Sequence, residues 1–141
     1  MPEVLCLDAS VVLKLYLPEE DAEEAKRLVR RALMQSEDLL VPSFFLAEMV
    51  STLRKAVHRG RMPREEANEG FTLLMMTPLE EIGGPEVYRR AWEIAEELGM
   101  PTIYDSVYLA VAELRGAEFW TADRKLFEKA KGRGFVHLLG E

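Results

Sequence analysis

Short apolar runs alternate with longer amphipathic stretches along this chain. The first run, residues 4–7, is fully apolar and predicts a strand buried on both faces, as in the middle of a parallel sheet. The same alternation predicts further strands at 39–41, 79–82, 118–120 and 135–139. The amphipathic stretches predict helices at 8–17, 21–33, 42–58, 64–75, 85–98, 104–114 and 123–131. Strands that alternate with helices indicate an α/β fold, in which a mainly parallel sheet lies between two layers of helices.

Local signals predict where several of these helices begin and end. Pro42 suits a first helical turn, and Asp21 followed by Glu24 forms a capping-box pattern. Gly99 and Gly116 favour helix ends, because glycine readily adopts the left-handed conformation that closes a helix. In parallel sheets, sites form beyond the carboxyl ends of the strands, so the residues that follow each strand are the candidates for chemistry.

Length and composition narrow the class of protein. The 141 residues predict one domain, spanning 1–141, with enough chain for a proper core. No apolar run approaches the ~20 residues that span a bilayer, and no basic leader precedes the first strand, so we predict neither a membrane segment nor a signal peptide. Cys6 is the only cysteine, which fits a reducing, cytoplasmic location. The two histidines, His58 and His137, stand too far apart for a Cys/His zinc pattern.

The distribution of acidic residues directs attention to the aspartates. The net charge of −7 argues against a general affinity for nucleic acid, because phosphate backbones favour a basic face. The chain contains 20 Glu but 5 Asp, so glutamate supplies the generic negative surface. Three of the five aspartates, Asp8, Asp105 and Asp123, follow a predicted strand or open a predicted helix. Taken singly, each of these positions favours a helix cap or a first-turn acid, with Thr102 as the partner of Asp105 in a capping box.

Glu48 is a fourth acid that needs an explanation. It shares one face of its predicted helix with Phe45, Met49, Thr52 and Ala56, a mostly apolar stripe. A carboxylate within such a stripe requires a cation, a hydrogen-bonding partner or a proton. An ion pair with a nearby Arg or Lys explains Glu48 as well as a functional site does.

Considered together, the four acids indicate more than caps. In a parallel α/β sheet their positions converge on one edge, where clustered carboxylates repel one another unless a cation intervenes. Oxygen ligands without cysteine or histidine suit a hard cation such as Mg²⁺ or Mn²⁺. A pair of such ions can hold a phosphodiester between them.

The ordered set of acids and their surroundings resembles the PIN domain family. The segments that carry the resemblance are VLCLDAS at 4–10, Glu48 on the third predicted helix, YDSVYLAVA at 104–112 and TAD at 121–123. Their order and spacing are similar to those of the VapC-type ribonuclease toxins of toxin–antitoxin pairs, and the resemblance covers essentially the whole chain.

The resemblance implies a five-stranded parallel sheet and endoribonuclease activity that depends on Mg²⁺ or Mn²⁺. It also implies a homodimer and inhibition by a cognate antitoxin, whose segment wraps a groove and can place a basic side chain near the acids. By position, the implied metal-binding and catalytic acids are Asp8, Glu48, Asp105 and Asp123, and the accessory polar groups are Ser10 and Thr121.

An RNA substrate also needs cationic contacts, and the sequence has two basic runs. The run at 54–64 is best explained as a solvated face and a basic helix end. The second run adjoins Asp123, which favours phosphate contact. Its members are Arg124, Lys125, Lys129, Lys131 and Arg133, of which the first three are the predicted RNA-binding residues.

Two other functions fit parts of the pattern. A PIN-like module that binds proteins with little or no catalysis is compatible with the fold but leaves the complete acid set unexplained. A Mg²⁺-dependent phosphatase of the haloacid-dehalogenase type also begins with a strand that ends in aspartate. That class expects a second aspartate two residues on, where this chain has Ser10.

Several large apolar side chains have simpler explanations. Tyr88 and Trp92, four residues apart on one predicted helix, are expected to pack inside the fold. The apolar residues near the end of the fourth predicted helix are expected in the core or on a dimer surface. They are Phe71, Leu74, Met75 and Met76.

Overall fold

One parallel sheet organises the chain. A computed structural model describes residues 4–16, 22–35 and 38–140, with five strands in the order β3-β2-β1-β4-β5. The strands are β1 (Val4–Leu7), β2 (Asp38–Pro42), β3 (Glu80–Ile82), β4 (Glu118–Thr121) and β5 (Val136–Leu138), and all neighbours are parallel. The predicted α/β class and parallel sheet are therefore confirmed.

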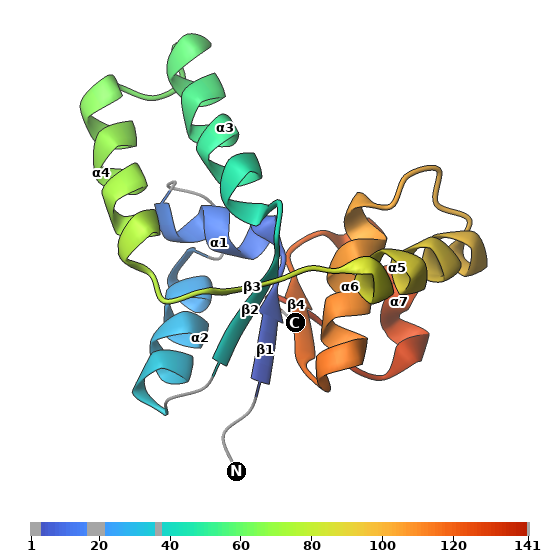
Figure 1. The fold of residues 1–141 in the computed structure, drawn as a ribbon. Coiled ribbons are helices and arrows are strands. Elements are labelled where there is room, and N and C mark those ends of the chain that lie inside the picture. The colour runs from blue at the N-terminus through green and yellow to red at the C-terminus, as the bar shows by residue number, and fades with distance from the viewer. Residues whose placement is uncertain (1–3, 17–21, 36–37, 141) are drawn as a thin grey trace.

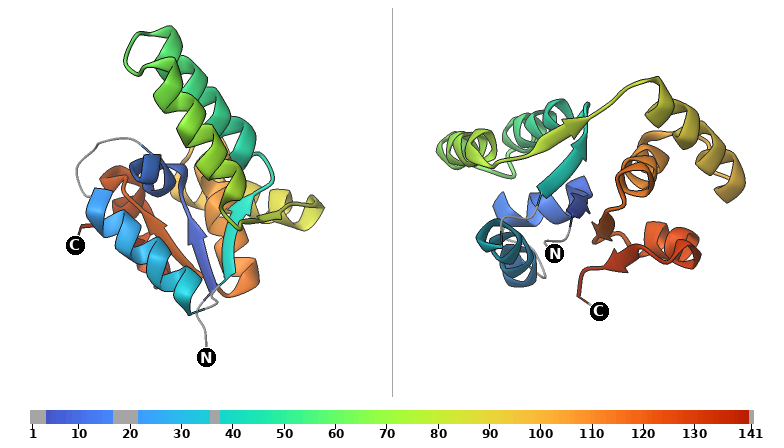
Figure 2. Two further views of the ribbon diagram at one scale, coloured as in Figure 1. Left: turned by 90° about the vertical axis from the view of Figure 1, so that its left-hand side faces the viewer. Right: turned by 60° about the horizontal axis from the view of Figure 1, so that its bottom comes forward.

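Helices connect the strands and cover the sheet. They are α1 (Ala9–Tyr16), α2 (Ala22–Met34), α3 (Phe45–His58), α4 (Arg64–Met76), α5 (Pro85–Leu98), α6 (Tyr104–Arg115) and α7 (Arg124–Ala130), followed by the 3₁₀ turn η1 (Lys131–Arg133). Figure 2 shows α1 and α2 on one side of the sheet and α5, α6 and α7 on the other. In Figure 1, α3 and α4 form a hairpin that projects beyond the sheet. Among the described residues, no helix is both long and apolar enough to cross a membrane.

The strand order determines where a site can form. The chain runs from β1 to β2 and β3 on one side, and then returns past β1 to β4 and β5 on the other. The connections that leave the carboxyl ends of β1 and β4 therefore diverge, and their divergence opens a crevice at that edge. Because Leu5, Cys6 and Leu7 are buried, the central strand β1 is firmly held and its carboxyl end has a defined position.

The sequence predicted two helix ends correctly and one helix start wrongly. Gly99 and Gly116 end α5 and α6 with φ of 67° and 63°, the left-handed conformation that the sequence predicted. Pro42 does not open a helix; it is the last residue of β2. The amide of Ser43 still donates a hydrogen bond of 3.1 Å to the carbonyl of Ile82, so sheet pairing continues past Pro42 and delays the helix. The predicted cap Asp21 lies outside the described residues.

Exposed apolar side chains contradict part of the sequence prediction. Tyr88 and Trp92 are 45% and 69% exposed, so the prediction that they pack inside the fold was wrong. The buried face of α5 consists instead of Val87, Ala91, Ile94 and Ala95. On α4, Leu74 is buried as expected, but four other large apolar side chains of this helix lie at the surface. They are Phe71, Leu73, Met75 and Met76.

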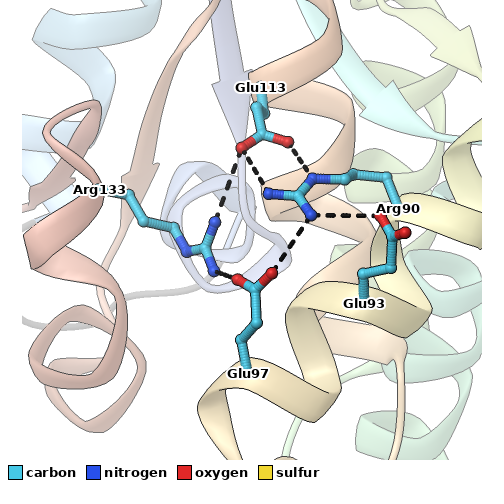
Figure 3. Close-up of polar contacts among 5 residues, drawn as sticks. All are labelled: Arg90, Glu93, Glu97, Glu113 and Arg133. Atoms are coloured by element: carbon cyan, nitrogen blue, oxygen red, sulfur yellow. Dashed lines mark hydrogen bonds and ion pairs between the residues drawn. The ribbon is translucent and has the colours of Figure 1, made fainter.

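An ion-pair network ties the second half of the fold together (Figure 3). Arg90 of α5 binds both carboxylate oxygens of Glu113 of α6, and it lies 3.2 Å from Glu93 and 3.4 Å from Glu97. Arg133 of η1 contacts Glu97 and lies 3.6 Å from Glu113. The pairing with Arg90 lowers the pKa of Glu113, and the pairing with Arg133 lowers the pKa of Glu97. Arg133 is therefore a structural residue rather than a free phosphate contact.

We predict that Glu113→Gln destabilises the protein in a pH-dependent way. The pKa of Glu113 is lower in the folded state than its ordinary value of 4.5. Its contribution to stability is therefore complete above about pH 4.5 and is lost as the pH falls through the lowered pKa. The cost at pH 7 should be about 1 kcal/mol, because the pair is partly exposed. Urea unfolding at pH 7 and at pH 3.5 measures the difference, which should narrow at the lower pH. Glu96→Gln, a change of an exposed glutamate on α5, is the matched control.

Candidate active site

The edge where β1 and β4 end carries the first of the predicted acids. Asp8 follows β1 directly, and its amide donates a hydrogen bond of 3.1 Å to the carbonyl of Trp120 in β4. Only 7% of Asp8 is exposed, although an aspartate with an ordinary pKa is charged at pH 7. Because β1 and β4 are parallel neighbours, the residues after both strands meet here.

Two hydroxyl groups hold the carboxylate of Asp8. Thr121 Oγ1 donates to Asp8 Oδ2 over 2.6 Å, and Ser10 Oγ donates to the same oxygen over 3.0 Å. Each hydroxyl is itself held by the loop after β4. The amide of Ala122 donates to Ser10 Oγ, and the amide of Asp123 donates to Thr121 Oγ1, both over 3.0 Å. Ser10 and Thr121 thus join the two strand ends around Asp8, in the neighbourhood that the resemblance implied for them.

Burial changes the acidity of Asp8. Removal from water raises the pKa of this carboxyl group to about 6, against the lowering effect of the hydrogen bonds from Thr121 and Ser10. The negative charge of Asp105 raises it further. The carbonyl of Asp8 accepts the amide protons of Val11 at 3.0 Å and Val12 at 3.3 Å, so Asp8 also stands at the start of α1.

Glu48 lies in the first turn of α3 and is half-buried, as its apolar stripe predicted. The hydroxyl of Tyr108 donates a hydrogen bond to Oε1 of the Glu48 carboxylate over 3.2 Å. Burial raises the pKa of Glu48, and the charge of Asp105 adds to the effect. Glu48 is therefore oriented by a buried tyrosine on α6, a contact between residues 60 positions apart that the sequence reasoning missed.

Asp105 occupies the first turn of α6 and couples the acids. Burial, then the charge of Asp123, raises the pKa of Asp105, while Lys129 lowers it. Asp105 also raises the pKa values of Asp8 and Glu48, and Asp123 raises that of Asp105, so Asp105 is linked electrostatically to each of the other acids. The predicted capping box with Thr102 is not formed. The residue before α6 is Ile103, and its carbonyl accepts a hydrogen bond from Ser106 Oγ instead.

Asp123 has a structural role at this edge. Its Oδ1 atom accepts hydrogen bonds from the amides of Lys125 at 2.9 Å and Leu126 at 3.3 Å. Asp123 therefore caps α7, as its position after β4 suggested, and the cap uses one oxygen of the carboxylate. The cap also fixes Asp123 beside Thr121, whose hydroxyl accepts its amide proton.

The candidate ligand atoms are of the type that a hard divalent cation prefers. Among the described residues, they do not surround a metal position completely. All the candidate ligands are carboxylate or hydroxyl oxygens, and the mutual repulsion of the carboxylates favours a cation. Within residues 4–16, 22–35 and 38–140, no group of three or more His, Cys, Asp or Glu side chains stands close enough together to hold a metal ion. Mg²⁺ is compatible with such a site, because it usually keeps several waters and binds through one or two carboxylates.

Basic side chains flank the acids on one side. Lys125 and Lys129 are exposed on α7, and the charge of Lys129 acts on Asp105. Arg124 begins the same helix, and its charge lowers the pKa of Glu128. Lys131 of the same basic run forms an ion pair of 2.7 Å with Glu128. Lys129 is thus a member of this run whose charge acts on an acid of the site, and Lys125 lies one helical turn before it on α7.

A separate groove lies between α3 and α4. Its volume is about 460 Å³, and the four acids are not among its lining residues. The lining is largely apolar, with two arginines and an asparagine: Val50, Leu53, Arg54, Val57, Arg64, Ala67, Asn68 and Phe71. This groove belongs to the helical hairpin that projects from the sheet (Figure 1).

Comparison with known proteins shows the family of the chain. The sequence profile of the PIN domain family matches residues 5–132. Ribonuclease VapC3 of Pyrobaculum aerophilum is 34% identical over 127 residues, which make up 89% of this chain and 93% of that protein.

Two crystal structures share the fold at low sequence identity. One is VapC20 of Mycobacterium tuberculosis, a sarcin-ricin loop cleaving toxin, with a TM-score of 0.65, 18% identity, and coverage of 96% of this chain and 98% of that one. The other is VapBC2 of Rickettsia felis bound to a DNA fragment from its promoter, with a TM-score of 0.63, 16% identity, and coverage of 96% of both chains. With a family profile over residues 5–132 and a VapC relative matched over nearly its full length, this chain belongs to the PIN domain family, in its VapC ribonuclease group.

Proposed function

We propose that this protein is a divalent-metal-dependent endoribonuclease, a VapC-type toxin, that hydrolyses RNA phosphodiesters at Asp8, Glu48, Asp105 and Asp123. The observation that carries the proposal is the arrangement at the carboxyl edge of the sheet, where Thr121 and Ser10 hold the buried carboxylate of Asp8 and the charge of Asp105 raises the pKa values of Asp8 and Glu48. PIN-domain ribonucleases in general depend on a divalent metal, and we propose Mg²⁺ or Mn²⁺ for this chain because all candidate ligands are oxygen atoms.

The bound cation would hold the scissile phosphate and lower the pKa of a water molecule toward neutrality. The residues of the chain supply the rest. Thr121 and Ser10 hold Asp8 in one orientation, and Tyr108 does the same for Glu48. A carboxylate, Asp105 or Asp8, accepts the proton of the attacking water. In-line attack of the water oxygen on phosphorus then breaks the bond to the 3′ oxygen, which takes a proton from solvent, and leaves a 5′-phosphate and a 3′-hydroxyl. Positioning and charge stabilisation account for most of the catalysis in this scheme.

We further propose a cognate antitoxin as the regulatory partner, with the groove between α3 and α4 as part of its binding surface. The groove supports this because its lining is mainly apolar and its arginines, Arg54 and Arg64, can pair with acidic side chains of a bound segment. We also propose a cytoplasmic location, because the proposed RNA substrate and antitoxin are cytoplasmic.

The alternative of a catalytically weak protein-binding module predicts no divalent metal binding. Calorimetry distinguishes the two. A nuclease should bind Mg²⁺ in the natural protein and bind it more weakly in Asp105→Asn, whereas a binding module should bind Mg²⁺ in neither. The phosphatase alternative loses support, because Ser10 stands where that class needs an acid and its hydroxyl donates to Asp8 instead.

We predict that Asp8→Asn and Asp105→Asn each abolish RNA cleavage without loss of stability. Total RNA incubated with Mg²⁺ or Mn²⁺, with an EDTA control and mapping of the ends, measures the activity. Because the ionised form of Asp8 is disfavoured by burial, Asp8→Asn should unfold in EDTA at pH 7.5 at a temperature no lower than that of the natural protein. Asp38→Asn, at an exposed position in β2, is the matched control and should cleave normally. Cleavage at the natural rate by either site variant would refute the proposed site.

We predict that Lys125→Ala with Lys129→Ala weakens RNA binding and flattens its salt dependence. The slope of log Kd against log salt should fall by roughly 1 to 2, since each lost phosphate contact on single-stranded RNA removes about 0.7. Arg54→Ala with Lys55→Ala, in the first basic run, is the control and should leave the slope unchanged. An unchanged slope in the α7 variant would rule out these phosphate contacts.

We propose that the homodimer forms through the outer face of α4, where Leu73 and Met76 are 53% and 73% exposed. Leu73→Glu with Met76→Glu should convert the protein to a monomer in light scattering, because two buried charges would face their copies across the interface. Met34→Glu, at a 79% exposed position on α2, should not change the molar mass. A monomeric natural protein, or a dimeric double variant, would contradict this assignment.

A further inference from the structure

An exposed aromatic side chain stands at the rim of the acid site. Tyr104 immediately precedes Asp105 at the start of α6, and it is 61% exposed although its ring is large and apolar. None of the roles assigned above uses it. Its place beside the acid that couples the whole site makes it a candidate for contact with substrate.

The ring of Tyr104 is fixed from one side. It meets Phe44 edge-on, with ring centroids 5.8 Å apart and an angle of 87° between the planes. Phe44 in turn meets Tyr108 at 5.8 Å and 85°. Edge-to-face contacts of this kind orient aromatic rings. The ring of Tyr104 is therefore positioned by Phe44, while most of its surface stays accessible.

The same contacts tie this ring to the acids. Phe44 precedes α3, and its carbonyl accepts the amide proton of Glu48 over 3.1 Å. The hydroxyl of Tyr108 binds the carboxylate of Glu48. Tyr104 is thus next to Asp105 in the chain, and through Phe44 it contacts the segment that leads to Glu48.

From this arrangement we infer that Tyr104 binds RNA by stacking on an unpaired base next to the cleaved phosphodiester. The inference rests on the proposed ribonuclease function and adds a requirement for single-stranded substrate. Unstacked bases of RNA loops and single strands stack on aromatic side chains, and a duplex does not offer them. Such stacking tolerates any base, because each has a π-face, so Tyr104 favours single strands without selecting a sequence.

Three variants test the role of the ring in cleavage of a single-stranded oligonucleotide. Tyr104→Leu removes the ring and should lower kcat/KM by about 10- to 100-fold, the usual effect of a lost stacking contact. Tyr104→Phe keeps the ring and should stay within about twofold of the natural protein. Tyr88→Leu, at another exposed tyrosine, should have no effect. Equal loss in Tyr104→Phe, or no loss in Tyr104→Leu, would overturn the inference.

Changes in the RNA give a readout that does not depend on the folding of a variant. An abasic nucleotide beside the cleaved bond should slow the natural protein by a similar factor, and should slow Tyr104→Leu no further, because the partner is already absent. Independent, multiplicative effects of the two changes would refute stacking. So would a Tyr104→Leu variant that cleaves RNA normally but resists its antitoxin, which would assign the ring to the protein partner. If the natural protein cleaves no RNA, the proposed function and this inference both fail; natural cleavage that ignores Tyr104 removes the inference alone.

Discussion

The buried carboxylate of Asp8 is the constraint on which this edge of the molecule depends. An acid with 7% exposure at the end of the central strand is costly unless its oxygens are satisfied. Thr121 and Ser10 satisfy one oxygen, and the loop after β4 holds both hydroxyls. The burial of a single charge thereby fixes the ends of two strands that are more than a hundred residues apart in sequence.

The sheet topology turns this local arrangement into a site. The connection from β3 returns past β1 through α5 and α6, and α6 delivers Asp105 to the edge where Asp8 already lies. The network of Arg90, Glu113 and Arg133 fastens that return path (Figure 3). The position of Asp105 thus depends on how α5, α6 and η1 pack together.

Charge is distributed unevenly in this acidic protein. The net charge of −7 is unfavourable for RNA, and the four acids add to the repulsion locally. Exposed lysines lie on α7, the helix that Asp123 caps, and one of them, Lys129, lowers the pKa of Asp105. A divalent cation and these lysines together would reverse the local sign of the field. The overall charge of the chain is therefore a poor guide to the substrate of its site.

The chain sequence by itself determined the order and type of the elements, because apolar periodicity and glycine positions report local structure directly. It also led to the prediction of the four candidate acids, since scarce aspartates after strands are conspicuous. It misjudged Pro42, where sheet pairing with β3 overrode the local helix signal, and Tyr88 and Trp92, whose side of α5 faces outward. Only the tertiary structure decided that Tyr108 orients Glu48, that Thr121 and Ser10 hold Asp8, and that Phe44 positions Tyr104. These are contacts between side chains on different elements, and they depend on how the elements pack, which no local pattern in the sequence specifies.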